Sequence, residues 1–183
     1  MFEDFKQKDS VTIVYTGEGK GKTSAALGLL TRALGSEWQV AFIQFIKHWE
    51  VGEHRFLDKI SKVYKNKLTF YRGGKGFYNA GEMSAKDVSD KEHKRAALET
   101  YEFSMKAVSS GKYQLVICDE INNAVNDGLL SKEDMENLLK AKHRQTSLCL
   151  TGRDFPKSLL KYADIATNMT KIRHHFDDKY LAN

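Results

Sequence analysis

One glycine- and lysine-rich stretch constrains the fold more than the rest of the sequence: residues 16–24, TGEGKGKTS. A run of β-branched and aromatic residues, 11–15, precedes it, and an alanine- and leucine-rich helical pattern over residues 25–34 follows it. A strand, a glycine-rich turn and a helix in this order form a phosphate-binding loop, because the glycines let consecutive backbone N–H groups point inward at an anion. The start of the helix adds further N–H groups and the positive end of the helix dipole.

The lysines and the threonine of this stretch carry its chemistry. Lys22 can reach the terminal phosphates of a nucleotide, Lys20 adds a second cation, and the Thr23 hydroxyl can ligate Mg²⁺. The usual pattern has a glycine five positions before Gly21, where this chain has Thr16, so we expect a loop one residue tighter than usual. A glycine-rich turn that binds nothing is the alternative, which the strand and helix on either side disfavour.

Charged residues follow two later apolar runs, at the points where the predicted strands end. Asp119 and Glu120 come directly after the run 113–118. An apolar strand that ends in an acid is the usual partner of a phosphate loop, because the carboxylate holds Mg²⁺ directly or through water. Arg153 follows the run 146–151 and is a candidate phosphate contact, with a surface ion pair to the next residue as the alternative.

Two further segments have two interpretations each. Lys47 and Glu53 belong to a predicted loop, 47–53, and either face the nucleotide or form a solvated pair; neither reading is preferred. Residues 72–79 form a glycine-rich loop that carries Phe77 among its aromatic residues. This loop either closes over a flat ligand or is a surface loop whose aromatics cap the core, and its composition alone favours the second interpretation.

Hydrophobic patterning predicts alternating strands and helices. Strands are expected at 11–15, 38–46, 68–71, 113–118, 146–151 and 165–170. Helices are expected at about 22–34, from Ser84 or Ser89 to about 109, at 131–142 and, briefly, after Pro156 to about 162. The pattern indicates an α/β protein with a three-layer, recombinase-like P-loop fold, whose central sheet has about six mostly parallel strands.

Length and composition indicate one domain of 183 residues, with a polar N-terminal arm at 1–10 and a single nucleotide-binding domain at 11–183. The apolar fraction of 41% and charged fraction of 29% are typical of soluble globular proteins. No run reaches the length of a membrane span, and residues 1–10 hold no apolar secretion segment, so a cytoplasmic protein without membrane contact is predicted. The net charge is +5, but the sequence has no basic stripe with interleaved aromatics, so nucleic acid is not an expected partner. Cys118 and Cys149 fall in apolar runs and are expected to be buried free thiols.

Together these residues resemble the ATP:corrinoid (cob(I)alamin) adenosyltransferases of the corrinoid-salvage type, from about residue 11 to about residue 176. The glycine–lysine loop with its early threonine, Thr16-Gly17-x-Gly19-Lys20-Gly21-Lys22-Thr23, is specific to this family. The other shared motifs are weak singly and persuasive jointly: Gln44-Phe45-Ile46-Lys47, Gly52-Glu53, Gly76-Phe77, Cys118-Asp119-Glu120, Leu150-Thr151-Gly152-Arg153, Ala163-Asp164 and Arg173-His174-x-Phe176.

The resemblance implies transfer of the 5′-deoxyadenosyl group of ATP to a Co(I) corrinoid, with release of triphosphate, in adenosylcobalamin synthesis or salvage. It implies Mg²⁺ or Mn²⁺ as cofactor, an electron-donating flavoprotein as partner and a homodimeric state. The implied catalytic residues are Lys22, Lys20 and Arg153. The implied ATP-binding residues are Gly17, Glu18, Gly19, Lys20, Gly21, Lys22, Thr23, Ser24, Lys47 and Glu53. The implied corrinoid-binding residues are Phe77 and Tyr78, and the implied metal ligands are Thr23, Asp119 and Glu120.

Two departures from the family pattern stand beside this resemblance. Asn79 occupies the position where the family has tryptophan, and the end of the sequence lacks the family's closing Gly-Ile-acid-aromatic segment. Both suit a divergent member with altered corrinoid preference or weaker activity. The alternatives are a P-loop ATPase or nucleoside kinase, because Asp119-Glu120 resembles the acid pair of ATPases, and a non-catalytic nucleotide or corrinoid sensor, because the tryptophan is missing.

Overall fold

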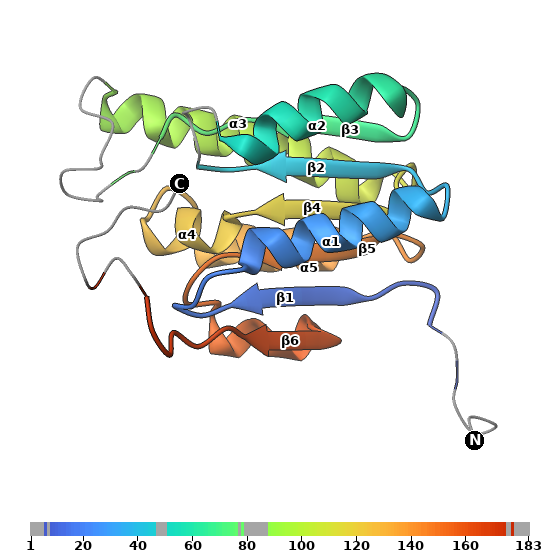
Figure 1. Ribbon diagram of the computed structural model, residues 1–183. Helices are drawn as coiled ribbons and strands as arrows, with labels where there is room; N and C mark the ends of the chain where they lie inside the picture. Colours follow the sequence, from blue (N-terminus) through green and yellow to red (C-terminus); the bar gives the residue numbers. More distant parts are fainter. Residues whose placement is uncertain are drawn as a thin grey trace.

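The computed structural model describes residue 6 and residues 8–46, 51–76, 78, 88–174 and 177. Its centre is a sheet of six parallel strands in the order β3-β2-β4-β5-β1-β6 (Figure 1). The strands are β1 (Thr12–Thr16), β2 (Val40–Gln44), β3 (Leu68–Arg72), β4 (Leu115–Asp119), β5 (Ser147–Thr151) and β6 (Ile165–Asn168). The helices are α1 (Lys22–Gly35), α2 (Gly52–Val63), α3 (Asp90–Ser109), α4 (Ile121–Asn126), α5 (Lys132–Ala141) and the 3₁₀ helix η2 (Lys157–Tyr162).

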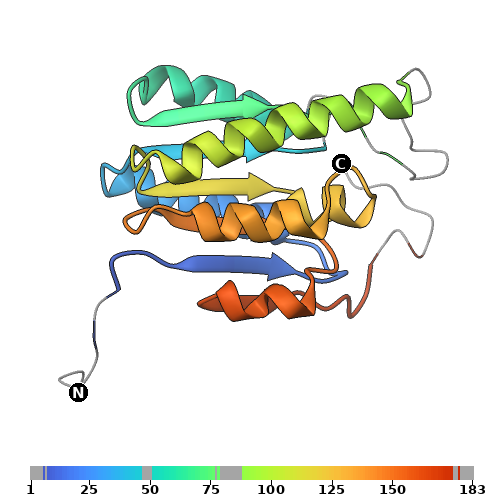
Figure 2. The ribbon, with the colours of Figure 1, turned by 180° about the vertical axis from the view of Figure 1, so that it is seen from behind.

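Helices cover both faces of the sheet. Helices α1 and α2 lie in front of it in Figure 1, and α3, α5 and η2 lie on the opposite face, which Figure 2 turns toward the viewer. The inner strands β2, β4 and β5 are therefore buried on both sides. Successive residues of β2 alternate between the two cores: Ala41 and Ile43 join the core under α3 and α5, whereas Val40 and Phe42 join the core under α1. This confirms the predicted three-layer α/β fold with a parallel sheet.

Local sequence signals set the ends of the helices. Helix α3 begins after Ser89, whose backbone N–H donates to the Glu92 carboxylate at 2.9 Å in a capping box. The structure thus chooses Ser89 over Ser84 as the cap. Ser131 caps α5 in the same way, because its hydroxyl accepts from the Asp134 N–H at 3.0 Å.

The expected loop at 47–53 is partly wrong, because residues 52–63 form helix α2. The buried side of this helix is narrow: His54 and Leu57 are buried, and Ile60 packs against the same core. Most residues of the helix are polar or charged, so its short apolar stripe did not lead to a helix prediction from the sequence. Among the described residues, no helix is both long and apolar enough to cross a membrane.

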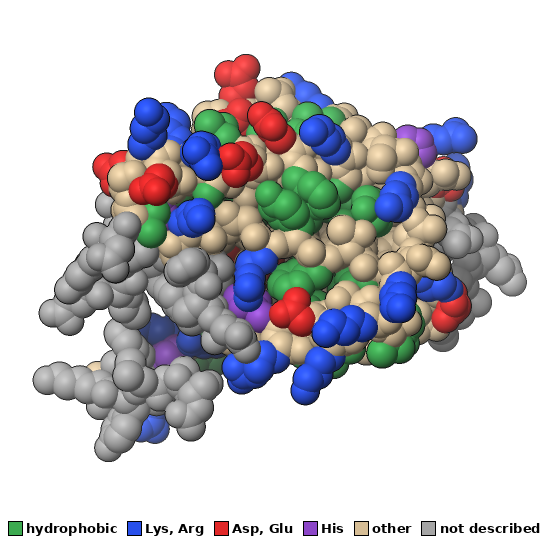
Figure 3. Space-filling view, turned by 90° about the horizontal axis from the view of Figure 1, so that it is seen from above, with side chains coloured by type: hydrophobic (Ala, Val, Ile, Leu, Met, Phe, Trp, Pro, Cys, Tyr) green, Lys and Arg blue, Asp and Glu red, His purple; other side chains and the backbone are tan. Residues whose placement is uncertain are grey.

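The two long edges of the molecule differ in character. Figure 3 looks down on the edge that carries β3, where hydrophobic side chains lie among charged ones. Phe56 and Val63 of α2 and Leu98 of α3 are large hydrophobic residues exposed on the two helices beside this edge. At the other edge, all four residues of β6 are exposed.

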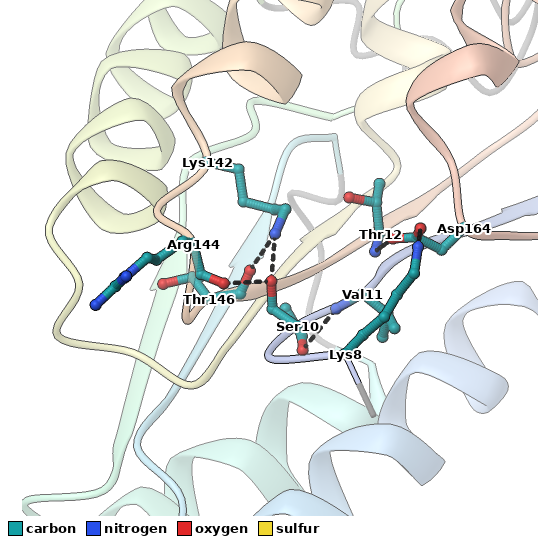
Figure 4. A network of polar contacts seen from close by, with 9 residues as sticks. Lys8, Ser10, Val11, Thr12, Lys142, Arg144, Thr146 and Asp164 are labelled. Carbon is teal, nitrogen blue, oxygen red and sulfur yellow. Dashed lines mark hydrogen bonds and ion pairs between the residues drawn. The ribbon is translucent and has the colours of Figure 1, made fainter. Parts of the chain in front are cut away.

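A polar network fixes the chain ahead of β1 to the edge of the sheet where the strands begin (Figure 4). Ser10 Oγ donates to the Arg144 carbonyl at 2.7 Å and accepts from Lys142 Nζ at 2.6 Å. The Asp164 carboxylate pairs with Lys8 and accepts from the Thr12 N–H at 2.8 Å. The last residues of the predicted N-terminal arm are thereby held at the edge opposite the strand ends that carry the site.

Candidate active site

The predicted phosphate loop connects β1 to α1 and packs against the residues that directly follow β6. Gly17 and Gly21 have φ angles of 104° and 105°, which favour glycine. A Cβ at Gly17 or Gly19 would lie 2.5 or 2.7 Å from the Met169 carbonyl oxygen. That carbonyl accepts the Gly19 N–H at 2.6 Å, and the Met169 N–H donates to the Thr16 carbonyl at 2.8 Å. The glycines therefore permit a close backbone contact within the protein as well as the shape of the loop.

The Lys22 ammonium lies across the loop. Its Nζ donates to the carbonyls of Gly17 and Gly19 at 2.6 and 2.7 Å. Burial lowers the pKa of Lys22, and the positive charges of Arg153 and Lys20 lower it further, against the opposing effect of Glu18 and Glu120. A bound polyanion would stabilise the charged form of this lysine, which is what a phosphate-binding position requires.

Thr23, at the start of α1, faces the acid at the end of β4. Its hydroxyl lies 3.3 Å from Asp119 Oδ2, while the Thr151 hydroxyl donates to Asp119 Oδ1 at 2.7 Å. Thr151 Oγ1 in turn accepts the N–H of Glu120, which has a left-handed backbone with φ of 62°. Strand β5 lies between β1 and β4, so Thr151 occupies the gap between the phosphate loop and the acid. Sequence reasoning placed Thr151 only in a family motif and gave it no role.

Three more residues extend this polar set toward β3. Gln44, at the end of β2, donates from Nε2 to Asp119 Oδ2 at 3.0 Å. His54 of α2 bonds through Nε2 to Gln44 Oε1, and Arg72 Nη1 lies 3.2 Å from His54 Nδ1. Gln44 and His54 are fully buried. The sequence signal for Gln44 was a polar residue that interrupts an apolar strand; His54 and Arg72 were missed, because only the folded chain brings them together.

Arg153 reaches the phosphate loop. Its guanidinium forms an ion pair with Glu18 at 3.1 Å, and both side chains are more than half exposed. The described residues thus pair Arg153 with Glu18 rather than with Asp154. The backbone beneath is fixed, because the Arg153 N–H donates to Asn123 Oδ1 at 2.7 Å and its carbonyl accepts from Asn126 Nδ2 at 2.8 Å. This leaves the side chain at the mouth of the loop, beside Lys22.

The oxygen atoms at this point fit Mg²⁺ bound together with phosphate. Thr23 and Asp119 are neighbours in space, and Glu120 follows directly at the start of α4. Within the described part of the chain, no group of three or more His, Cys, Asp or Glu side chains could hold a metal ion alone. Mg²⁺ commonly takes one or two carboxylates and completes its shell with water and substrate phosphates.

Besides residues of the phosphate loop and of the strand ends, the predicted site includes Lys47, Glu53, Phe77 and Tyr78. Glu53 lies in the first turn of α2 rather than in a loop, while Lys47 and Phe77 lie outside the described residues. Tyr78 is partly buried against the core under α3, with its ring centroid 5.2 Å from that of His93. For Tyr78, this agrees with the interpretation in which the loop's aromatics cap the core.

The first half of the glycine-rich loop packs tightly on the end of β2. Gly73 N–H donates to the Gln44 carbonyl at 3.0 Å, and Gly76 N–H donates to the Ile46 carbonyl at 2.9 Å. A Cβ at Gly73 would lie 1.8 Å from Thr100 Oγ1, and one at Gly74 would lie 2.4 Å from the Ile46 carbonyl carbon. Gly74 is needed because two backbones approach each other closely, and Gly73 is needed because the Thr100 side chain lies against it.

Comparisons with known proteins show which family this chain resembles. The family model described as "ATP:corrinoid adenosyltransferase BtuR/CobO/CobP" matches residues 8–183. The corrinoid adenosyltransferase of Escherichia coli K12 is 30% identical over 169 residues, which cover 91% of this chain and 80% of that protein. Protein all2391 of Nostoc is also 30% identical, over 88% of this chain, but this chain spans only 44% of that protein's length.

A search of solved structures returns the flagellar accessory protein FlaH from Methanocaldococcus jannaschii. The TM-score is 0.55 at 11% sequence identity, over 88% of this chain and 71% of the other, so this likeness concerns the fold alone. The family match decides among the functions left open by the sequence, and it favours neither the ATPase or kinase nor the sensor. The chain therefore belongs to the ATP:corrinoid adenosyltransferase family, the enzymes that adenosylate corrinoids with ATP.

Proposed function

We propose that the loop between β1 and α1 binds the triphosphate of ATP and that this triphosphate leaves whole when the adenosyl group is transferred. The observation that carries the proposal is the convergence of one buried acid, Asp119, with Thr23 and the half-buried Lys22 around a glycine loop. In this arrangement the lysine and Arg153 lie where the negative charge of a triphosphate would be greatest.

The proposed reaction needs no general acid or base. A Co(I) corrinoid donates an electron pair to C5′ of the ribose, the C5′–O bond breaks, and its electron pair leaves on the triphosphate oxygen. Cobalt becomes formally Co(III) with a new cobalt–carbon bond. The protein's contribution is to align C5′ with the cobalt and to stabilise the charge that builds on the leaving oxygen. We assign the second task to Lys20, Lys22 and Arg153.

The metal part of this proposal uses Mg²⁺ or Mn²⁺. Thr23, Asp119 and Glu120 would hold the ion, which would neutralise phosphate charge when bound. Asp119 is held in place for this by the hydroxyl of Thr151 and the amide of Gln44, at 2.7 and 3.0 Å. Residues 17–24, Lys47 and Glu53 complete the proposed ATP site.

The corrinoid and partner assignments come from the family resemblance. We propose that Phe77 and Tyr78 contact the corrinoid, and that Asn79 in place of tryptophan alters which corrinoid is preferred. A flavoprotein electron donor, a homodimer and a cytoplasmic location belong to the same proposal. The subunit number is measured by light scattering of the purified chain, where the mass of a single chain would refute the dimer.

The experiment that tests the function mixes the protein with ATP, Mg²⁺ and chemically reduced cobalamin. The absorption spectrum of an adenosylated corrinoid should appear together with one equivalent of triphosphate. Lys22→Ala should abolish both, and Lys106→Ala, an exposed lysine in the last turn of α3, should leave both unchanged. Release of ADP without corrinoid, or full turnover by the Lys22→Ala protein, would refute the assignment.

A further inference from the structure

A continuous chain of hydrogen bonds leads into the site, and two of its members, His54 and Arg72, have no role assigned above. It begins at Arg72 on β3, passes through His54 on α2 and Gln44 on β2, and ends at Asp119 on β4. Arg72, Gln44 and Asp119 are the last residues of three neighbouring strands. His54, Gln44 and Asp119 have no exposed surface, so each of their polar atoms depends on a partner within the protein.

The donors and acceptors along this chain fit one arrangement. Arg72 and the Val51 N–H both direct hydrogens at His54 Nδ1, at 3.2 and 3.5 Å, so that nitrogen is the acceptor. The proton of the neutral ring then resides on Nε2 and is donated to Gln44 Oε1. With its oxygen occupied, Gln44 can only turn its NH₂ group toward Asp119.

The opposite orientation of Gln44 would be unfavourable at the same spacing. If the amide were turned over, its oxygen would face Asp119 Oδ2 at about the 3.0 Å now spanned by N–H and O. Two acceptors would then meet in a buried place, and the carboxylate would lose a donor. The same carboxylate oxygen lies 3.3 Å from the Thr23 hydroxyl, so any shift of Asp119 changes the proposed metal position.

We propose that His54 is a positioning residue, which acts through Gln44 to hold the Asp119 carboxylate toward Thr23, and that Arg72 fixes the tautomer of His54 for this purpose. The inference rests on the proposed metal–triphosphate role of the site. It concerns the metal-dependent part of ATP binding and not the corrinoid.

The test is calorimetric titration of ATP into the whole chain without corrinoid, once with Mg²⁺ and once with EDTA. His54→Leu removes the donor to Gln44 and puts an apolar side chain of similar size in its place. It should weaken ATP binding in Mg²⁺ by about tenfold, the effect of about 1.4 kcal/mol from one disturbed buried hydrogen bond, and change binding in EDTA by less than about twofold. His54→Gln, whose amide can donate in the same direction, should stay within about threefold of wild type in both titrations.

A matched control lies at the opposite end of the strands, where β5 begins. Thr146 is also fully buried, and its hydroxyl donates to the Tyr113 carbonyl at 2.8 Å. Thr146→Val should lower the melting temperature and leave both titrations unchanged. If His54→Leu does not fold, Arg72→Met decides the question, because Arg72 is exposed and its loss should still weaken binding in Mg²⁺ alone, by about threefold.

Equal losses in Mg²⁺ and EDTA, unchanged binding in His54→Leu, or a His54→Gln protein as impaired as His54→Leu would overturn the proposal. Failure of the wider function gives a different result. If wild type forms no adenosylated corrinoid from reduced cobalamin, while the variants still show the metal-specific loss, the positioning role stands and the reaction assignment falls.

Discussion

At the scale of single residues, the glycines of the phosphate loop shape the loop and also allow it to pack against Met169. Gly19 gives its N–H to the Met169 carbonyl, so this amide is used inside the protein rather than offered to a phosphate. Lys22, Thr23 and Ser24, the first residues of α1, have backbone N–H groups that no earlier helical carbonyl can accept. We therefore expect the helix start to provide most of the amide contacts to phosphate, with the loop glycines fixing its direction.

Two glycine substitutions separate packing from conformational preference. Gly19→Ala would put a Cβ 2.7 Å from the Met169 carbonyl oxygen, and so should displace the loop and weaken ATP binding by at least about tenfold. Gly28→Ala, inside α1 with no atom near its added Cβ, should raise the free energy of unfolding by about 0.5–1 kcal/mol. Urea unfolding and ATP titration measure the two effects. Normal ATP binding by Gly19→Ala would show that the backbone at Met169 can move away from the added Cβ without disturbing the ATP site.

Phe77 gives a prediction that separates reduction of the corrinoid from transfer of the adenosyl group. If its ring helps displace the lower ligand of a Co(II) corrinoid, Phe77→Ala should impair turnover that starts from Co(II). Reaction with corrinoid already reduced to Co(I) should stay largely intact, because the nucleophile then needs no further reduction. Parallel assays with the two starting oxidation states measure this. Equal losses in both would contradict the proposed role.

At the scale of elements, the end of the sheet is more informative than any single motif. The last residues of all six strands are polar: Thr16, Gln44, Arg72, Asp119, Thr151 and Asn168. Parallel strands bring these ends to one edge, which is where α/β proteins bind their ligands. An apolar strand that ends in a polar residue is therefore a sign of the site that a sequence can show, and it is the basis on which the sequence predicts a role for Asp119.

The sequence could predict the strands well and the helix α2 badly, for a physical reason. Buried parallel strands are apolar throughout, so their runs stand out, although Trp38 extended the second run beyond the observed β2 and is 41% exposed. Helix α2 buries a histidine where an apolar residue would mark the stripe. The partners that make a buried histidine acceptable, Gln44 and Arg72, are 10 and 18 positions away, so local periodicity could not reveal them.

The contact between the N-terminal segment and the start of β6 leads to a prediction about pH. Hydrogen bonds from Lys8 and from the Thr12 N–H lower the pKa of Asp164. A carboxyl with a lowered folded-state pKa stabilises the fold above its unfolded pKa and loses this effect as the pH falls through the folded value. Because Asp164 is exposed and solvent screens its pairing with Lys8, Asp164→Asn should be less stable than wild type near pH 7 by no more than about 0.5 kcal/mol, and the difference should shrink at strongly acidic pH.

Urea unfolding at several pH values measures this, and Asp58→Asn on the exposed side of α2 serves as the control. The control should follow the wild-type curve throughout. A stability gap between wild type and Asp164→Asn that does not change with pH would show that the carboxylate charge contributes nothing to folding.

At the scale of the whole molecule, the sheet separates two cores, and each contains one cysteine. Cys118 belongs to the core under α3 and α5, and Cys149 belongs to the core under α1. Burial raises the pKa of Cys118 to about 12 and that of Cys149 well above its ordinary value. A thiol reagent at pH 8 should therefore modify neither cysteine in the folded protein and both in guanidinium, because it needs an accessible thiolate.

The rate of this modification shows whether the two layers open together. ATP that binds only the folded chain lowers the population of the open state by a factor of 1 + [ATP]/Kd, about 100-fold at 100 times Kd. The phosphate loop connects β1 to α1, and Asp119 is the last residue of β4, so bound ATP should contact the sheet and the α1 layer together. The modification rates of both cysteines should therefore fall by the same factor. Single variants Cys118→Ala and Cys149→Ala assign the two rates. A Cys149 rate that stays fast in ATP, while Cys118 slows, would show that the α1 layer opens without the rest of the domain.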